Sequence, residues 1–181
     1  MYGDISEITN EEADLKINNE YSKSKFETES KLEKLEKIKS FILRVNAPYS
    51  YKIITKTVLK IFIENAFQNK PIIYSGNGNR EQDFTHVDDI AAAVLLCSSN
   101  VANSGVYNIS SGTPISMKNL ANLIKSVLPN CTSTITNSGK ADNQENYRAK
   151  INISKAKIEL NWSPKITLDQ GIKEWIKFLS K

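Results

Sequence analysis

The feature that most constrains the fold is a short, nearly continuous apolar run from Phe41 to Val45. A run of this kind suits a strand covered on both faces, as in a parallel sheet. Residues 21–39 before it and residues 54–69 after it space their apolar side chains at helical intervals. The order helix, strand, helix therefore predicts an α/β fold with parallel strands.

The rest of the chain continues this alternation. Strands are expected at 72–74, 106–109 and 132–136, with loops at 75–79 and 137–149. Helices are expected at 90–98, after Ser116, at 154–160 and at 168–180. The expected N-caps are Asp88 or Asp89 for the first helix, Ser116 for the second, and a Thr167–Gln170 capping box for the last. Trp162 and Trp175 are expected in the core.

Composition and charge exclude several classes of protein. The 181 residues carry 24 Lys and Arg against 20 Asp and Glu, and the net charge of +4 is spread along the chain, which gives nucleic-acid binding little support. Cys97, Cys131 and the single histidine, His86, form no metal-ligand pattern, so no metal site is expected. The longest apolar run, at 90–97, is too short to span a membrane, and the start has no apolar signal core. We expect a cytoplasmic protein.

The sharpest local motif is Tyr21-Ser22-Lys23-Ser24-Lys25. On a helix, Tyr21 and Lys25 lie one turn apart and share a face. A phenol has a pKa of about 10 and is a poor base at neutral pH, but an ammonium fixed beside it favours the phenolate. Such a pair acts as a general acid/base toward a hydroxyl. The same spacing also occurs by chance in many helices.

Several further motifs, in order along the chain, accompany this pair. They are Tyr2-Gly3, Glu11-Glu12, Glu29, Leu43-Arg44-Val45-Asn46-Ala47-Pro48-Tyr49, Ile73 to Gly78, Gln82 to Ala91, Gly105 to Ile109, Leu160 to Pro164 and Leu168 to Ile172. Together they resemble the NAD-dependent epimerase/dehydratase family, extended short-chain dehydrogenase/reductases acting on nucleotide sugars. The resemblance covers essentially the whole chain.

The resemblance implies an oxidation of a sugar carbon by hydride transfer to NAD. Tyr21 would be the general acid/base, and Lys25 would lower its pKa and contact the nicotinamide ribose; Pro48 also falls at a cofactor position. The substrate diphosphate would be held by cationic side chains, for which the candidates are Arg80, Lys140 and Arg148.

The sequence departs from the family pattern at three places. Gln82 stands where an Arg usually precedes the Asp-aromatic pair, so Arg80 would have to reach the phosphate from a displaced position or would be a solvated loop charge. Ser50 replaces a Gly after Tyr49, and Ala47 replaces a frequent Asn. These differences leave the sugar unassigned.

No Gly-rich phosphate-binding turn is present, because Gly76-Asn77-Gly78 lacks a third Gly and opens onto no βαβ unit. We therefore expect the C-terminal part of a Rossmann-type fold plus a small α/β substrate-binding subdomain, with the N-terminal dinucleotide-binding half and the catalytic Ser/Thr missing. Residues 1–70 would be the Rossmann remnant that carries the Tyr-x-x-x-Lys helix. Residues 71–181 would be mainly the nucleotide-sugar region, with returning Rossmann elements.

The expected function is that of the C-terminal portion of a truncated NAD-dependent isomerase resembling UDP-glucose 4-epimerases, with epimerisation favoured over dehydration. Two alternatives stay open: a non-catalytic nucleotide-sugar-binding fragment, and a subunit completed by a separate Rossmann chain. A homodimer through helices 21–39 and 54–69 is a further expectation, although packing within the chain explains those apolar residues equally well. An uncovered edge of strand 41–45 predicts marginal stability or association.

Overall fold

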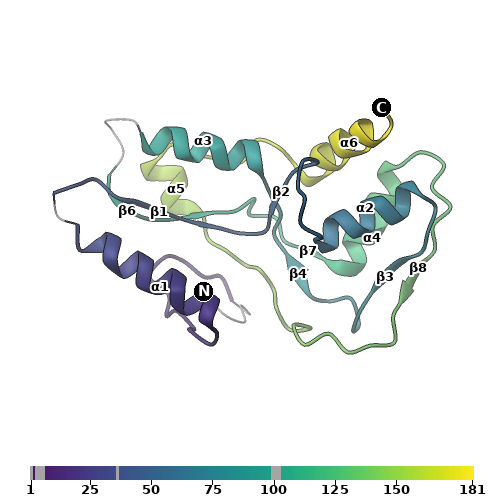
Figure 1. Ribbon diagram of the computed structural model, residues 1–181, viewed down its shortest axis with the longest axis horizontal. Helices are drawn as coiled ribbons and strands as arrows, with labels where there is room; N and C mark the ends of the chain where they lie inside the picture. Colours follow the sequence, from purple (N-terminus) through teal and green to yellow (C-terminus); the bar gives the residue numbers. More distant parts are fainter. Residues whose placement is uncertain (1, 3–6, 36, 99–102) are drawn as a thin grey trace.

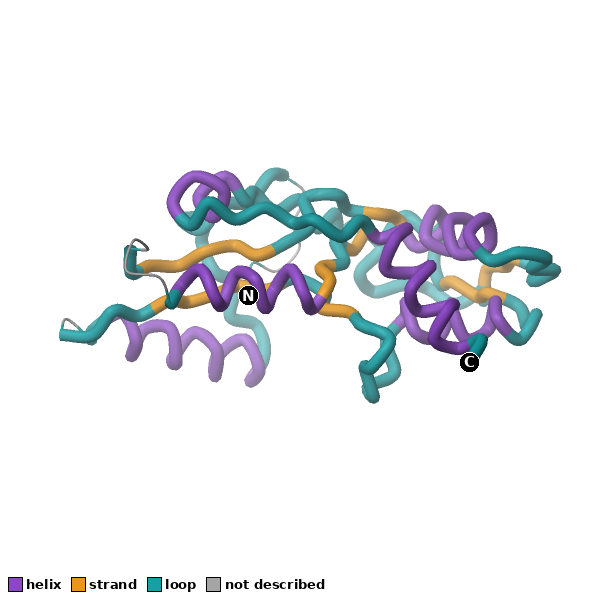
Figure 2. Tube along the Cα trace, turned by 90° about the horizontal axis from the view of Figure 1, so that it is seen from above, coloured by secondary structure: helices purple, strands orange, loops and turns teal. Residues whose placement is uncertain are grey.

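A computed structural model describes residues 2, 7–35, 37–98 and 103–181 of the chain. Figure 1 shows an α/β arrangement in two lobes, and the view from above in Figure 2 separates the same two groups of elements. Of the four strand pairs among the described residues, three are parallel and one, β4 with β7, is antiparallel. The α/β class with parallel strands is confirmed.

The described helices are α1 (Glu20–Glu33), α2 (Val58–Phe67), α3 (Val87–Cys97), α4 (Met117–Val127), α5 (Ser154–Glu159) and α6 (Leu168–Leu179). The described strands are β1 (Phe41–Val45), β2 (Pro48–Tyr49), β3 (Ile72–Tyr74), β4 (Glu81–Gln82), β5 (Thr85–His86), β6 (Gly105–Ile109), β7 (Ile115–Ser116) and β8 (Ile135–Asn137).

The first lobe is built on the parallel pair of β1 and β6, in which Phe41 lies opposite Gly105 and Val45 opposite Ile109. Figure 1 shows α3 and α5 on one face of this pair and α1 on the other. Its buried apolar cluster comes from β6, α3, α5 and the segment after α5, and includes Tyr107 and Trp162. The apolar run that predicted a covered strand therefore does form one.

The second lobe packs α2, α4 and α6 together beside the parallel pair of β3 and β8. Its core contains the apolar faces of all three helices, for example Leu59 on α2, Leu120 on α4 and Trp175 on α6, each at most 2% exposed. The apolar face of α2 is thus buried within its own chain. This favours packing within the chain, rather than a dimer contact, as the reason for the apolar residues of α2.

Two N-caps in the second lobe follow the sequence. The Ser116 Oγ accepts a hydrogen bond from Asn119 N at the start of α4, and Thr167 and Gln170 form the expected capping box of α6. The cap of α3 was predicted wrongly, because the imidazole Nδ1 of His86 accepts from Asp88 N at 3.2 Å. The imidazole of His86, one residue before α3, therefore caps the helix in place of the expected aspartate carboxylate.

Several element boundaries also differ from expectation. Helix α1 ends at Glu33 rather than 39; Glu36 lies outside the described residues, and Ile38 is 64% exposed, so the apolar spacing there serves no buried face. Helix α2 begins at Val58, not 54, because Thr57 caps it. Strand β8 begins at Ile135 rather than 132, where it pairs with β3.

Both apolar clusters draw residues from each side of position 70, as Leu43 and Tyr107 in the first lobe and Leu59 and Leu120 in the second illustrate. The division into 1–70 and 71–181 stays a prediction. In the described part of the chain, no helix is long and apolar enough to cross a membrane, and no group of three or more His, Cys, Asp or Glu gathers as metal ligands would.

Candidate active site

The predicted acid/base pair lies at the start of α1. The Asn19 side chain accepts from Ser22 N at 2.8 Å, and the Ser22 hydroxyl accepts in return from Asn19 N, so the first turn is fixed by a capping box. This places Tyr21 and Lys25 on one face, with the Lys25 Nζ 5.6 Å from the centroid of the Tyr21 ring. Tyr21 is 70% exposed, so the phenol is accessible to a substrate.

The face of α1 that meets the sheet is polar. Ser22 and Glu29 are the buried residues of this helix. Arg44 on β1 donates to Glu29 from Nε, at 3.2 Å from both carboxylate oxygens, and from Nη2 at 2.7 Å. The helix that carries Tyr21 and Lys25 is therefore fixed to the sheet by a forked ion pair, with Glu29 one turn beyond Lys25.

The same arginine gathers the N-terminal segment onto the sheet. Its Nη1 donates to the Tyr2 hydroxyl at 2.8 Å and to the Glu11 carbonyl at 3.1 Å, and Tyr2 in turn donates to the Asn108 Oδ1 at 2.6 Å. Burial raises the pKa of Tyr2, against the opposing effect of Arg44. Gly3, the other half of the Tyr2-Gly3 motif, lies outside the described residues.

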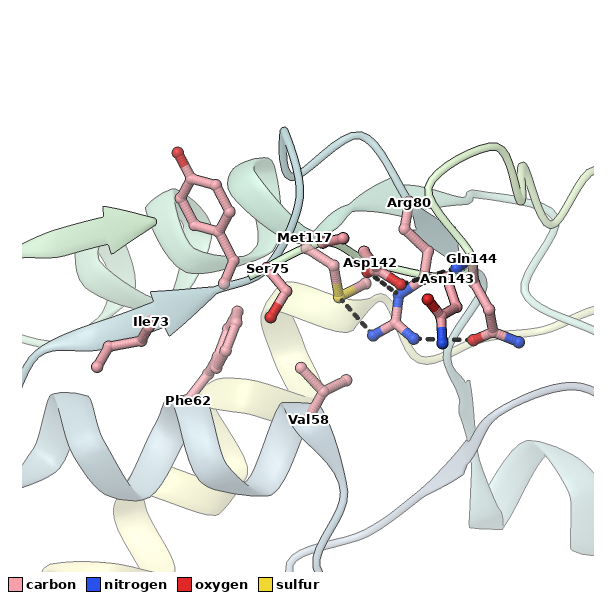
Figure 3. Close-up of a pocket in the computed structure, with 11 residues that line it drawn as sticks. Val58, Phe62, Ile73, Ser75, Arg80, Met117, Asp142, Asn143 and Gln144 are labelled. Carbon is pink, nitrogen blue, oxygen red and sulfur yellow. Dashed lines mark hydrogen bonds and ion pairs between the residues drawn. The ribbon is translucent and has the colours of Figure 1, made fainter. Parts of the chain in front are cut away.

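A pocket of about 440 Å³ opens in the second lobe. Figure 3 shows Val58 and Phe62 of α2 on one side of it, and Arg80 with Asp142, Asn143 and Gln144 on the other. One wall is thus apolar and the other carries a cation, a carboxylate and amides, a combination suited to a ligand that is part ring and part polar.

Arg80, the predicted phosphate-binding residue, faces this pocket, but other side chains already contact its guanidinium. Its Nε lies 3.2 Å from the Asp142 Oδ2, its Nη1 donates to the Gln144 Oε1 at 2.9 Å, and its Nη2 lies 3.6 Å from the Met117 sulfur. Sequence reasoning missed Asp142 and Gln144, because nothing local shows that a loop some sixty residues later folds over Arg80.

The remaining predicted site residues lie apart. Lys140 is exposed and lines a second pocket, which shares Ala141 with the first. Arg148 lines neither pocket; its Nη1 donates to the carbonyls of Asn79, Glu145 and Tyr147, at 2.8 to 3.1 Å. Pro48 lies in β2, paired with Thr85, and is exposed. The structure therefore places Lys25 beside Tyr21, and it places Arg80 and Lys140 in the linings of two pockets that share Ala141. Arg148 instead contacts the loop backbone.

The turn at Gly76-Asn77-Gly78 holds an internal carboxylate. The backbone N–H groups of Asn77 and Asn79 donate to Glu145 at 3.0 and 3.3 Å, and a Cβ at Gly76 would clash with that carboxylate. The turn leads into β4 rather than into a helix. These residues do not fit the pyrophosphate of NAD, because an internal carboxylate already accepts from the turn's N–H groups.

Two buried aspartates position loops. Asp83, fully buried, accepts from Gly112 N at 2.8 Å and from the backbone and hydroxyl of Ser111. Asp89, expected as a cap, instead accepts from Lys165 N and Ile166 N at 2.9 and 3.1 Å, while its carbonyl accepts from the Trp162 indole. His86 is buried, and its Nδ1 accepts from Asp88 N.

Comparison with known proteins places the chain in a family. A family model described as GDP-mannose 4,6 dehydratase matches residues 1–175. The UDP-glucuronate 4-epimerase of Thermodesulfobacterium geofontis is 30% identical over 119 residues, which is 65% of this chain and 36% of that protein. The dTDP-4-dehydro-6-deoxyglucose reductase of Escherichia coli is 29% identical over 163 residues, 87% of this chain and 51% of that protein.

Solved structures share the fold. The UDP-glucose 4-epimerase of Thermotoga maritima with UDP-glucose superposes with a TM-score of 0.86 at 23% identity, over 99% of this chain and 60% of that one. The dTDP-glucose 4,6-dehydratase of Bacillus anthracis in complex with NAD gives 0.85 at 24%, over 99% and 58%. The chain therefore belongs to the NAD-dependent nucleotide-sugar epimerase/dehydratase family, and it spans about a third to a half of the curated relatives named here.

Proposed function

We propose that this chain carries the acid/base and nucleotide-sugar-binding portion of an NAD-dependent nucleotide-sugar epimerase, in preference to a dehydratase. The observation that supports this most is the Lys25 ammonium, 5.6 Å from the centre of the exposed Tyr21 ring, on a helix in the family-matched region. Tyr21 exchanges a proton with a sugar hydroxyl, and Lys25 places a positive charge beside its ring. NAD is the cofactor by family, and none of the described residues is assigned to its pyrophosphate.

The Arg80 pocket is the proposed site for the nucleotide diphosphate. A guanidinium is the side chain best suited to bidentate phosphate binding, and the apolar wall from Val58 and Phe62 suits a base or sugar ring. Lys140 is proposed to add a second charge from the neighbouring pocket. Arg148 is proposed to act on the substrate indirectly, because its guanidinium holds the backbone of the loop that carries Asp142.

The first test is calorimetric titration of the full chain with UDP-glucose, other UDP-sugars and, separately, NAD. We expect UDP-glucose to bind, and Arg80→Ala to weaken binding roughly 10- to 100-fold, the effect of losing charge-assisted hydrogen bonds. Lys173→Ala, which removes an exposed lysine of α6, is the matched control and should leave the affinity unchanged. Loss of binding in both variants would contradict a specific role for Arg80.

The second test is turnover of UDP-glucose in the presence of NAD, compared between the wild-type chain and Tyr21→Phe. Removing a general acid/base is expected to lower kcat by about 10² to 10⁴ while the UDP-glucose affinity is retained. Equal turnover by Tyr21→Phe would contradict the acid/base assignment. Binding of UDP-glucose without any turnover would instead support a non-catalytic function.

A second candidate is a nucleotide-sugar-binding fragment without catalysis, or a subunit completed by a separate Rossmann chain. The Glu145 carboxylate in the Gly76–Gly78 turn favours it, because no other glycine-rich turn is available for the cofactor phosphates among the described residues. UDP-glucose binding without NAD binding supports this candidate, and NAD binding by the chain alone contradicts it. Turnover restored by an added Rossmann chain would identify the subunit form.

We further propose a cytoplasmic address and association through α1, on which the Phe26 side chain is exposed. Helix α2 is a weaker candidate for a dimer contact, since its apolar face is buried against α4 and α6. Sedimentation of the chain over a range of concentrations tests this proposal. A monomer at all concentrations would contradict it.

A further inference from the structure

We infer that Asp142 is a specificity-determining residue of the Arg80 pocket, a fixed negative charge beside the guanidinium that opposes the binding of anionic ligands. This inference rests on the proposed function, because it takes Arg80 as the phosphate-binding residue. The Asp142 Oδ2 lies 3.2 Å from the Arg80 Nε at the wall of the pocket (Figure 3). The site that a phosphate would use is therefore partly neutralised by the protein itself.

The pairing of these two residues is poorly aligned. Although the two atoms are close, the Arg80 Nε donates no hydrogen bond of good geometry to any described residue. The other two nitrogens meet a neutral amide oxygen of Gln144 and the thioether of Met117, both weaker acceptors than a carboxylate. The guanidinium thus has no partner that accepts two hydrogen bonds from it. A diphosphate is an anion that can accept two hydrogen bonds from one guanidinium.

Asp142 is held by its own loop rather than by Arg80. Its Oδ1 accepts from the backbone N–H of Gln144 at 2.9 Å, which is an Asx turn. On one side, the Lys140 carbonyl accepts from Gly76 N at 2.8 Å, and on the other Glu145 binds the Asn77 and Asn79 N–H groups. The carboxylate therefore stays beside Arg80 whether or not the guanidinium is well bonded.

The electrostatic consequence depends on the charge of the ligand. A phosphate that reaches Arg80 meets the negative charge of Asp142, whose side chain is only 12% exposed and so is incompletely screened. A neutral nucleoside meets no such repulsion. Asp142 therefore selects for ligands that bind Arg80 strongly enough to offset its charge, and weakens binding of all phosphorylated ligands relative to neutral ones.

The test is calorimetric titration of the full chain with UDP and with uridine. Asp142→Asn is well matched, because asparagine keeps the Asx turn and removes the charge alone. We expect Asp142→Asn to bind UDP roughly three- to tenfold more tightly and uridine with unchanged affinity. Asp169→Asn, which removes the same charge from an exposed pair on α6, should change neither affinity.

Three results would overturn the inference: UDP binding by Asp142→Asn no tighter than wild type, an equal gain for uridine, or an equal gain in Asp169→Asn. Circular dichroism of each variant confirms its fold. If the wild type binds UDP but Asp142→Asn shows no gain, this inference alone fails; if neither chain binds UDP or uridine, the proposed function fails with it.

Discussion

Two arginine–carboxylate pairs in this chain show opposite geometries. Arg44 and Glu29 form a fork with three contacts of 2.7 to 3.2 Å, and each side chain is 11% exposed. Arg80 and Asp142 have similar burial, at 20% and 12%, but share one misaligned contact of 3.2 Å beside an open pocket. Burial alone therefore does not distinguish a structural ion pair from one available to a ligand; the alignment of the donors does.

The difference follows from what each carboxylate belongs to. Glu29 lies on a regular helix facing a strand, so both partners are fixed by backbone hydrogen bonds and can meet in a fork. Asp142 lies in a loop whose Asx turn sets its position independently of Arg80. The first pair joins two elements of the fold, whereas the second leaves donors of the guanidinium unused.

The strongest way to break this comparison is to remove each arginine in turn. Arg44→Ala leaves Glu29 buried without its partner, which is expected to lower the free energy of unfolding by about 3–5 kcal/mol. Arg80→Ala is expected to cost less than Arg44→Ala, because the Arg80 Nε makes no aligned hydrogen bond to Asp142, which keeps its Asx turn. Urea denaturation of both variants measures this, and equal losses would contradict the distinction.

A gentler change tests the charge of the first pair separately from its shape. Glu29→Gln keeps a similar side chain but replaces a charged acceptor of Arg44 with a neutral one, so a loss of about 2 kcal/mol in unfolding free energy is expected. If the pair positions α1 for catalysis, turnover should also fall through kcat with little change in UDP-glucose affinity. Rescue of kcat by Glu29→Asp would support positioning, whereas a fall in affinity alone would contradict it.

Much of the fold could be predicted from local signals. The Ser116 cap predicted α4, the Thr167–Gln170 capping box predicted α6, and Trp175 lies in the core as expected. These features depend on residues within a few positions of one another, for which spacing and side-chain chemistry are sufficient. The covered strand at Phe41–Val45 was likewise visible as an apolar run.

What could not be predicted depends on contacts between distant segments. The two-residue strands β2, β4, β5 and β7 exist only through their partners, and no local pattern marks them. In the site, the Tyr21–Lys25 spacing was readable, but the Asp142 contact with Arg80 and the contact of Arg148 with the Asn79 carbonyl join segments more than sixty residues apart. The charge of the arginines made them candidates for phosphate binding, but their contacting residues could not be predicted.

High pH should weaken the Arg44 region. Burial raises the pKa of Tyr2, which accepts from Arg44, and of Tyr49 and Tyr107 elsewhere. Because the folded pKa values exceed the unfolded value of about 10, stability from these phenols is present below that pH and is lost as pH rises above it. Each tyrosine contributes at most about 1.4 kcal/mol per pH unit, and Tyr2, being partly exposed and screened, contributes less.

Urea denaturation midpoints measured from about pH 8 to about pH 11, a range that brackets the ordinary phenol pKa, test this prediction. Tyr2→Phe lowers stability at every pH through its lost hydrogen bond, so the informative quantity is the slope above the unfolded pKa, which should be shallower than in the wild type. An unchanged slope would show that Tyr2 ionises no less readily in the folded chain.

The smallest effect is expected where a charge pair is exposed on one helix. Asp169 and Lys173 on α6 meet at 2.7 Å, with side chains 40% and 60% exposed. The acid lies in the first turn and four residues before the base, the favourable orientation, so Asp169→Asn is expected to cost about 0.5 kcal/mol. Addition of salt to about 1 M should remove most of that difference, because exposed charges are then screened. If Asp169→Asn instead cost as much as Glu29→Gln at all salt concentrations, distance rather than alignment and burial would govern the strength of these pairs.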